Sequence, residues 1–284
     1  MKKDFDNQLN HWIEKEKAAS KLSGIVVDLW YNKSIELVLF RKKLYDKGIE
    51  LILGNHALAR KIIKKELTVH DTLQLAEAIA KLDIAHTKID LGRLGSEWLD
   101  AKVKGEKDIN SFVTNQLADL IGKNDHDRQG CDVVLYGFGR IGRIAARILI
   151  EKTGKGQQLL LKGIVIRGEL DKAQISKRAE LLKTDSTFGP FRGTVEEDIE
   201  NQCLIINGQK VQLISAGKAS EIDYTAYGIN DAILIDNTGS SRDREGLGEH
   251  LKAKGIAKVL LTAPGKEGIP NIVYGINHDE FEID

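Results

Sequence analysis

The chain has 284 residues, of which 42% are hydrophobic and 30% are charged, as is typical of a globular protein. Lys plus Arg and Asp plus Glu each number 42, so the formal net charge of zero gives no bulk attraction to nucleic acid or anionic lipid. The length favours two domains. The two cysteines and seven histidines show no metal-ligand spacing, so we expect no metal site and no disulfide framework.

The N-terminal segment is charged and lacks the apolar centre of a signal peptide. No apolar run in the sequence is long enough to span a bilayer. We therefore expect a cytoplasmic protein that has neither a membrane nor a nucleic acid as its partner.

Residues 1–128 are predicted to form an all-helical N-terminal extension. Apolar residues recur at helical spacing over Thr72–Leu99, and Ile25–Tyr45 is a second apolar-rich helical candidate. Thr68 and Asp71 have the spacing of a capping box before the first of these helices. The polar, glycine-bounded segment 122–130 then interrupts the pattern, so we place a linker there and a second domain at 129–284.

The pattern changes after the linker, where short β-rich runs alternate with helical stretches. The predicted strands are Val133–Tyr136, Leu160–Arg167, Leu204–Ile206, Val211–Ser215, Ala232–Asp236, Val259–Thr262 and Ile272–Tyr274. The predicted helices are Ile144–Glu151, Lys172–Leu182 and Glu245–Lys254. Asn207-Gly208 is a strong signal for a hairpin turn. This alternation predicts an α/β fold with a doubly wound, mostly parallel sheet of the Rossmann type.

A glycine-rich loop follows the first of these strands directly. The strand enters Gly137-x-Gly139-x-x-Gly142, and a helix-forming run follows, which is the context that a dinucleotide-binding loop requires. Gly137 permits a tight turn, Gly139 lets the backbone approach a pyrophosphate, and Gly142 lets the helix pack on the strand. The helix N-terminus then offers N–H groups and a partial positive charge to phosphates.

Five ordered motifs carry a resemblance to a known family. They are G-F-G-R-I-G-R, Asp185-Ser-Thr-Phe-Gly189, Asn237-Thr-Gly239, Thr262-Ala-Pro264 and Tyr274-Gly-Ile-Asn-His278. Because the motifs follow one another in this order, the sequence from 131 to 284 resembles the cofactor-binding half of glyceraldehyde-3-phosphate dehydrogenases. The whole chain resembles the subgroup with a long helical N-terminal extension. The Asp185 and Tyr274 motifs argue against another Rossmann dehydrogenase, such as one of the aspartate-semialdehyde type.

The resemblance implies a role for several residues. Arg140 and Ile141 would contact the pyrophosphate through their backbone N–H groups. Thr238 and Gly239 would lie beside the cofactor, and Thr262 would approach the nicotinamide end. These threonines are also ordinary turn residues at strand ends. The Asp185 motif is interpreted mainly as architecture, with a contact to the cofactor edge as the alternative.

The choice between NAD and NADP depends on the end of the strand Leu160–Arg167. NAD-preferring members carry an acidic residue there. If Arg167 holds this position, its guanidinium would accommodate a 2′-phosphate and favour NADP. If the alignment shifts by two, Glu169 would accept hydrogen bonds from the ribose hydroxyls and favour NAD. Arg167 is also interpretable as a solvated strand-end residue, and we favour tolerance of NADP.

The nucleophilic cysteine and catalytic histidine of the family would follow the Tyr274 motif, and the sequence ends six residues after His278. Cys131 and Cys203 are not expected to replace the nucleophile. We therefore expect no catalytic residue in this chain, and a fragment that is inactive alone. The intact protein would oxidise and phosphorylate glyceraldehyde 3-phosphate as a homo-oligomer. The alternative is a non-catalytic dinucleotide-binding module whose helical domain binds a partner.

Overall fold

The computed structural model describes residues 2–123, 129–215, 217–266 and 268–281. The chain divides into two compact units, Met1–Arg128 and Gln129–Asp284. Most of the predicted linker, residues 124–128, lies outside the described residues. No helix in the described ranges combines the length and the apolar character that crossing a bilayer would need.

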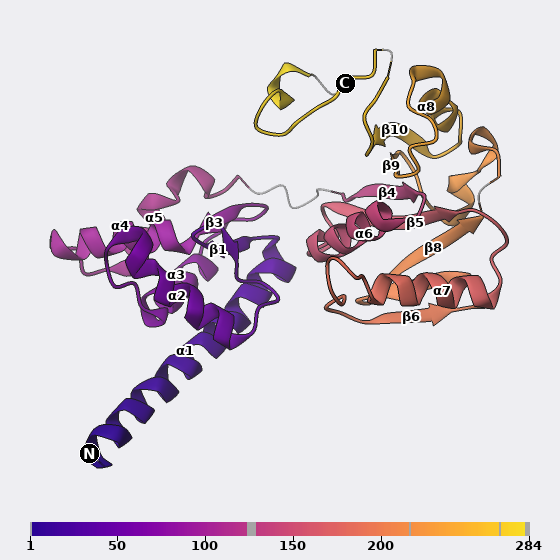
Figure 1. Cartoon of the computed structure of the whole chain (residues 1–284). Helices are drawn as coiled ribbons and strands as arrows, with labels where there is room; N and C mark the ends of the chain where they lie inside the picture. Colours follow the sequence, from indigo (N-terminus) through magenta and orange to yellow (C-terminus); the bar gives the residue numbers. More distant parts are fainter. Residues whose placement is uncertain (1, 124–128, 216, 267, 282–284) are drawn as a thin grey trace. The chain divides into compact units, whose positions relative to one another are not determined.

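The N-terminal unit is mostly helical and also contains a small sheet (Figure 1). Its helices are α1 (Lys2–Lys33), α2 (Ile49–Ile63), α3 (Val69–Ala80), α4 (Leu91–Val103) and α5 (Ile109–Gln116). Its strands are β1 (Glu36–Leu39), β2 (Lys42–Lys43) and β3 (Lys88–Asp90), in the order β2-β1-β3. One apolar core joins the C-terminal half of α1 to α3 and β1, and Trp98 is buried in it. Trp30 is also buried.

The small sheet corrects the prediction of an entirely helical extension. The helix predicted over Ile25–Tyr45 ends at Lys33, where Ser34 turns to a positive φ of 52° and β1 begins. The helix predicted over Thr72–Leu99 is interrupted by β3, which pairs in parallel with β1. The apolar residues that suggested helices are buried in β1 and β3 because the sheet packs into the same core.

The predicted capping box before α3 is confirmed. The Thr68 hydroxyl accepts a hydrogen bond from the Asp71 amide at 3.2 Å, and the Asp71 carboxylate accepts one from the Thr68 amide at 3.1 Å. Two N–H groups that the helix itself leaves unpaired are thereby satisfied.

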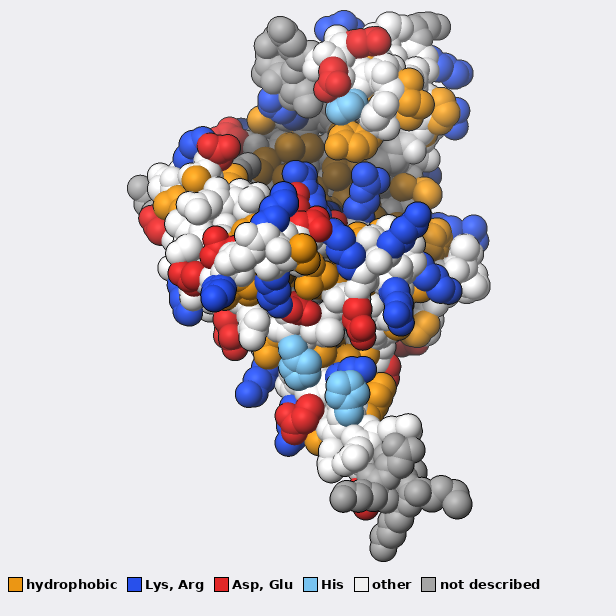
Figure 2. All heavy atoms as spheres, turned by 90° about the vertical axis from the view of Figure 1, so that its left-hand side faces the viewer, with side chains coloured by type: hydrophobic (Ala, Val, Ile, Leu, Met, Phe, Trp, Pro, Cys, Tyr) orange, Lys and Arg blue, Asp and Glu red, His pale blue; other side chains and the backbone are white. Residues whose placement is uncertain are grey.

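Charges of both signs are interspersed on the face of the molecule in Figure 2. Charged side chains also form ion pairs on the N-terminal unit. Lys65 Nζ lies 2.6 Å from Asp100 Oδ2, and Lys102 Nζ lies 2.9 Å from Asp71 Oδ1. The N-terminal unit therefore has a surface of mixed charge.

The C-terminal unit is the predicted doubly wound α/β domain (Figure 1). Its strands are β4 (Cys131–Tyr136), β5 (Leu159–Ile166), β6 (Val195–Asp198), β7 (Cys203–Ile206), β8 (Gln209–Ser215), β9 (Ala232–Asp236) and β10 (Ile256–Leu261). Its helices are α6 (Arg140–Lys152), α7 (Lys172–Lys183) and α8 (Arg244–Leu251).

The sheet has the order β10-β9-β4-β5-β8-β7-β6. The first five strands in this order are parallel, and β7 and β6 continue it antiparallel. The predicted hairpin turn joins β7 to β8, and Asn207 and Gly208 both have the positive φ that a two-residue turn requires. The strand order reverses between β4 and β9, which is where doubly wound sheets bind ligands.

Both faces of this sheet are buried at its centre, where β4 lies, as a parallel sheet requires. Val133 and Leu135 of β4 face a core that contains residues of α6 and α7, whereas Val134 faces a core with Tyr224 and Ile256. Successive side chains of β4 therefore point to opposite faces of the sheet. The last residue of the strand, Tyr136, lies at the carboxyl edge.

One strand prediction is wrong, and one strand was not predicted. The segment predicted as the strand Ile272–Tyr274 forms a turn, in which the Val273 amide donates to Asn277 Oδ1 at 2.7 Å. The edge strand β6 was not predicted, because its sequence V-E-E-D is short and its acidic residues are exposed.

Candidate functional site

The glycine loop begins with a turn that only glycine adopts without strain. Gly137 follows β4 with a φ of 93°, and its amide donates to Val165 O at 2.9 Å. A Cβ on Gly137 would lie 2.7 Å from Thr238 Cγ2. The loop is therefore held against the ends of both β5 and β9.

The other two glycines of the motif have opposite surroundings. A Cβ on Gly142 would lie 2.3 Å from the carbonyl oxygen of Gly137, so α6 approaches the turn as closely as the sequence predicts. A Cβ on Gly139 would meet no atom within 4 Å. The protein itself does not require glycine at 139, and the backbone there is open to an approaching group.

Helix α6 begins at this open backbone. Gly139 is its N-cap, and in the described part of the chain no side chain caps the helix. The Arg143 amide is the first to donate back along the helix, to Gly139 O at 3.0 Å, so the amides of Arg140, Ile141 and Gly142 precede the intrahelical ladder. The side chains of Arg140 and Ile141 are exposed. Amides at a helix N-terminus are suited to bind an anion.

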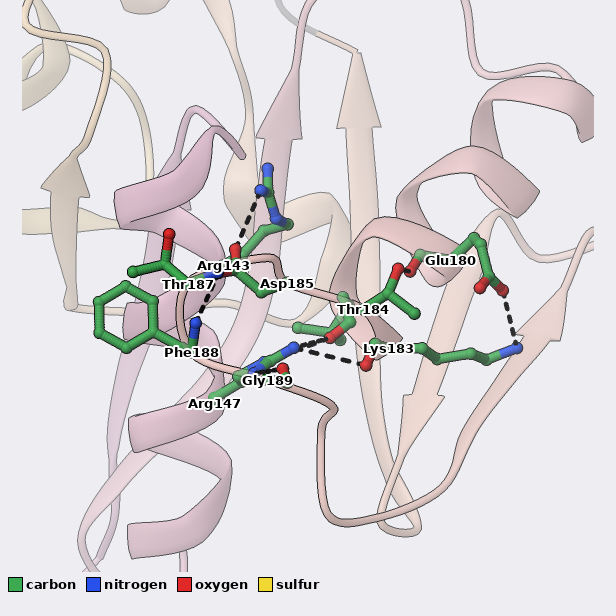
Figure 3. A network of polar contacts seen from close by, with 10 residues as sticks. Arg143, Arg147, Glu180, Lys183, Thr184, Asp185, Thr187, Phe188 and Gly189 are labelled. Carbon is green, nitrogen blue, oxygen red and sulfur yellow. Dashed lines mark hydrogen bonds and ion pairs between the residues drawn. The ribbon is translucent and has the colours of Figure 1, made fainter.

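The second arginine of the motif holds the Asp185 segment in place (Figure 3). Arg143 Nη2 lies 3.4 Å from Asp185 Oδ2, and the two side chains are 15% and 4% exposed. The other oxygen of Asp185 accepts from the amides of Thr187 and Phe188 at 2.9 and 3.0 Å. These amide hydrogen bonds first, and Arg143 second, hold the pKa of Asp185 below its ordinary value.

One turn further along α6, Arg147 ties the same segment to the helix. Its guanidinium donates to Leu182 O at 2.7 Å and to Gly189 O at 2.9 Å (Figure 3). The Asp185-Ser-Thr-Phe-Gly189 motif thus joins the end of α7 to α6. These contacts support the interpretation of the motif as architecture.

At the end of β9, Asp236 organises the turn that contains Thr238 and Gly239. Asp236 Oδ1 accepts from both the amide and the hydroxyl of Thr238, each at 2.7 Å. Gly239 then takes a φ of 63°. Thr262 lies at the end of the neighbouring strand, where its hydroxyl donates to Asp236 O at 3.1 Å and lies 3.2 Å from Asn237 Oδ1.

A buried His–Asp pair lies beneath this turn. His250 Nε2 is 3.4 Å from Asp236 Oδ2, and the side chains are 4% and 1% exposed. The His250 ring also packs edge-on against Tyr136, with 4.5 Å between centroids. Burial opposes ionisation of Asp236, but the contacts from His250 and Thr238 outweigh it and hold the pKa of Asp236 below its ordinary value.

A cavity of about 240 Å³ opens where β4, β5 and β9 end. It is lined by Tyr136, Gly137, Phe138, Gly139, Arg143, Val165, Ile166, Arg167, Arg178 and Thr238. Of the residues proposed from sequence, this set includes Gly137, Gly139, Arg167 and Thr238. Arg140, Ile141 and Gly142 adjoin it on α6, whereas Gly239 and Thr262 lie in the β9 and β10 end loops and are not lining residues.

Sequence reasoning missed Arg143 and Arg178 as residues of this cavity. Arg178 lies within α7, and the local sequence pattern does not distinguish it from an ordinary surface arginine. Arg143 could have been found, because it is the last residue of the G-F-G-R-I-G-R motif. Glu169, the alternative to Arg167, is exposed beyond the strand end and is not a lining residue.

Neither thiol lies at this edge of the sheet. Cys131 begins β4 at the amino end, and its Sγ contacts the adjacent Asp132 O at 3.7 Å. Cys203 is buried at the start of β7, and burial raises the pKa of its thiol. Within the described ranges, no three His, Cys, Asp or Glu residues are grouped so as to hold a metal ion.

Residues 131–244 match the family model described as glyceraldehyde 3-phosphate dehydrogenase, NAD binding domain. The C-terminal unit belongs to this family of NAD-binding domains. Among dehydrogenases of the family, the A subunit of the chloroplast enzyme from Zea mays is 36% identical over 152 residues, which cover 54% of the chain. The enzyme from Ogataea parapolymorpha is 33% identical over 153 residues, also 54% of the chain.

The similarity to one relative also includes the N-terminal unit. A glyceraldehyde-3-phosphate dehydrogenase-like protein from Pseudomonas aeruginosa is 44% identical over 264 residues, or 92% of the chain. The chain spans 56% of this relative, and its matches cover 35% of the maize and 42% of the yeast dehydrogenase. The chain therefore spans about half the length of the curated relatives that it matches.

Proposed function

We propose that the C-terminal unit binds NAD or NADP as the cofactor-binding part of a phosphorylating glyceraldehyde-3-phosphate dehydrogenase. The observation that carries this proposal is the uncapped N-terminus of α6, which follows an open Gly139 at the reversal of the strand order. A pyrophosphate fits such a site, because three backbone amides and the helix dipole complement its charge.

Each site residue has a role in this proposal. The amides of Arg140 and Ile141 bind the pyrophosphate, and Gly139 lets it approach the backbone. Thr238 and Gly239 lie along the cofactor, and Thr262 is placed toward the nicotinamide end. When bound, the nicotinamide would supply the hydride acceptor for a reaction in which an aldehyde and inorganic phosphate give an acyl phosphate, with release of a proton. The thiols of Cys131 and Cys203 do not supply the nucleophile, since neither lies at the carboxyl edge of the sheet.

The test is calorimetric titration of the purified chain with NAD and with NADP. Gly139→Ala adds a Cβ where a phosphate would approach, and we expect it to weaken binding by about tenfold or more through loss of amide–phosphate hydrogen bonds. Gly248→Ala is the matched control, since a Cβ there also meets no atom within 4 Å but lies in α8. Absence of binding to the unaltered chain would refute the proposal.

A second measurement addresses the chemistry. We expect the chain, mixed with glyceraldehyde 3-phosphate, phosphate and either cofactor, to produce no absorbance of reduced nicotinamide. The reason is the position of the two thiols, and a Cys131→Ser, Cys203→Ser variant should bind the cofactor as the unaltered chain does. Turnover that both substitutions abolish would show that one of these thiols is the nucleophile.

A further inference from the structure

The cavity beside the glycine loop has an unbalanced charge. Three of its lining residues are arginines, and none is a carboxylate. Arg143 is neutralised by Asp185. Arg167 and Arg178, in contrast, form no ion pair in the part of the chain that the structure describes. The cavity therefore presents two guanidinium groups whose charge a bound anion could balance.

Arg178 reaches the cavity from α7 with part of its hydrogen-bonding capacity unused. Its Nη2 donates to Gln174 Oε1 at 3.3 Å, whereas its Nε is buried without an acceptor among the described residues. A buried N–H group without an acceptor is costly, so a ligand oxygen at this position would remove a penalty as well as add an attraction.

Arg167 reaches the same cavity from the end of β5, and the turn after it is fixed. Gly168 has a φ of 90°, and its carbonyl accepts a hydrogen bond from the Ser215 hydroxyl at 2.7 Å. The charge of Arg167 also acts on the Tyr136 hydroxyl, where it opposes the effect of burial and of Asp236 on the pKa. Arg167 thus lines the same cavity as Tyr136, the last residue of β4.

We propose that Arg167 and Arg178 together bind a phosphate monoester on the adenosine ribose, so that this domain selects NADP over NAD. The proposal rests on the proposed function, because it assumes that a dinucleotide occupies the glycine loop. In doubly wound domains, the residue that ends the second strand adjoins the ribose 2′ position. An acidic residue there would repel a phosphate, whereas two guanidinium groups bind its oxygens with charge-assisted hydrogen bonds.

Glu169 does not reverse this preference. Its side chain is exposed and is not among the residues that line the cavity. Arg167 is exposed as well, but it lines the cavity and Glu169 does not, so the carboxylate adds little repulsion to a group bound there.

The test compares NADP with NAD in calorimetric titrations of four chains: unaltered, Arg167→Ala, Arg178→Ala and Arg192→Ala. Arg192 is an exposed arginine that is not among the lining residues, so its variant controls for loss of charge alone. We expect the unaltered chain to bind NADP about tenfold or more tightly than NAD. Arg178→Ala and Arg167→Ala should each weaken the binding of NADP and bring its affinity close to that of NAD, with little change in the affinity for NAD.

A second measurement needs no variant. We expect 2′,5′-ADP to compete with NADP about tenfold or more strongly than 5′-ADP does, because only the former carries the 2′-phosphate. Equal competition, or equal affinity for NAD and NADP in the unaltered chain, would overturn the arginine subsite and leave dinucleotide binding intact. Binding of neither cofactor would overturn the proposed function itself.

Discussion

At the scale of single residues, one glycine of the loop is needed for packing of the protein and another is placed for binding a ligand. Gly142 is required by the protein, since a Cβ there would meet the Gly137 carbonyl oxygen at 2.3 Å. Gly139 meets nothing in the protein, so its conservation as glycine would be a demand of the ligand. The two positions are three residues apart, and we predict that substitutions at them have different effects on stability.

We expect Gly142→Ala to lower the free energy of unfolding by about 1–3 kcal/mol, because α6 must shift away from the turn. Gly139→Ala should change it by less than about 0.5 kcal/mol. Urea denaturation of the intact chain, followed by far-ultraviolet circular dichroism, measures both. Equal stabilities of the two variants would show that α6 does not pack on the turn as described.

The sequence predicts those residues of the site whose positions depend only on neighbouring residues in the chain. The positions of Gly137, Gly139 and Gly142 follow from the order strand, turn and helix. The role of Arg178 depends on where α7 lies relative to β5, which no local pattern encodes. The exposure of Glu169 likewise depends on the path of the chain after Gly168.

At the scale of elements, long-range contacts explain the errors in the N-terminal unit. The turn between β1 and β2 places Phe40 and Arg41 at positive φ values of 49° and 65°. Their amides donate to the two carboxylate oxygens of Asp90, at 2.8 and 3.0 Å. Asp90 also caps α4 by accepting from the Gly92 amide at 2.8 Å. A partner 50 residues away cannot be inferred from helical periodicity, whereas the local capping box of α3 can.

A buried histidine links helices α2 and α3, and it should make the stability of the N-terminal unit depend on pH. His56 Nδ1 lies 2.7 Å from Ile52 O, and its Nε2 lies 2.7 Å from Thr72 Oγ1. Burial lowers the pKa of His56 from its ordinary 6.5. The unfolded chain therefore binds a proton at a higher pH than the folded chain does. The stability that depends on neutral His56 is complete above about pH 6.5 and is lost as the pH falls through the folded pKa.

We expect the urea midpoint of the N-terminal unit to fall between pH 7 and pH 5. In neutral His56, Nδ1 donates to Ile52 O, so Nε2 accepts from the Thr72 hydroxyl. His56→Leu should reduce this fall, and the Thr72 hydroxyl can then donate to Val69 O, which lies 3.1 Å away. Tryptophan fluorescence reports this unit alone, since all three tryptophans, at 12, 30 and 98, precede residue 128. His11→Leu, at an exposed position on α1, is the control. An unchanged pH dependence of stability in His56→Leu would show that protonation of His56 is not its cause.

At the scale of the whole molecule, the two units have separate apolar cores. One core contains residues between Ala18 and Val113, and the other two contain residues between Val133 and Ile256. Separate cores predict that a ligand of one unit stabilises that unit alone. We expect a saturating concentration of the preferred dinucleotide to raise the unfolding temperature of the C-terminal unit by several degrees. The transition followed by tryptophan fluorescence should not move.

Circular dichroism reports both units, so one of two transitions should shift on addition of the dinucleotide. Gly139→Ala should abolish the shift. A tryptophan transition that moves with the dinucleotide would show that the two units are energetically coupled.

The first amides of α6 have a further consequence. In the described part of the chain, neither a side chain nor a carbonyl of the helix accepts from them. We therefore expect their protons to exchange with solvent water, most readily at the exposed residues Arg140 and Ile141. A bound pyrophosphate would protect these protons without any change in the fold. Deuterium uptake at positions 140–142 therefore measures occupancy of the loop directly, and it distinguishes a dinucleotide bound at the loop from one bound elsewhere on the protein.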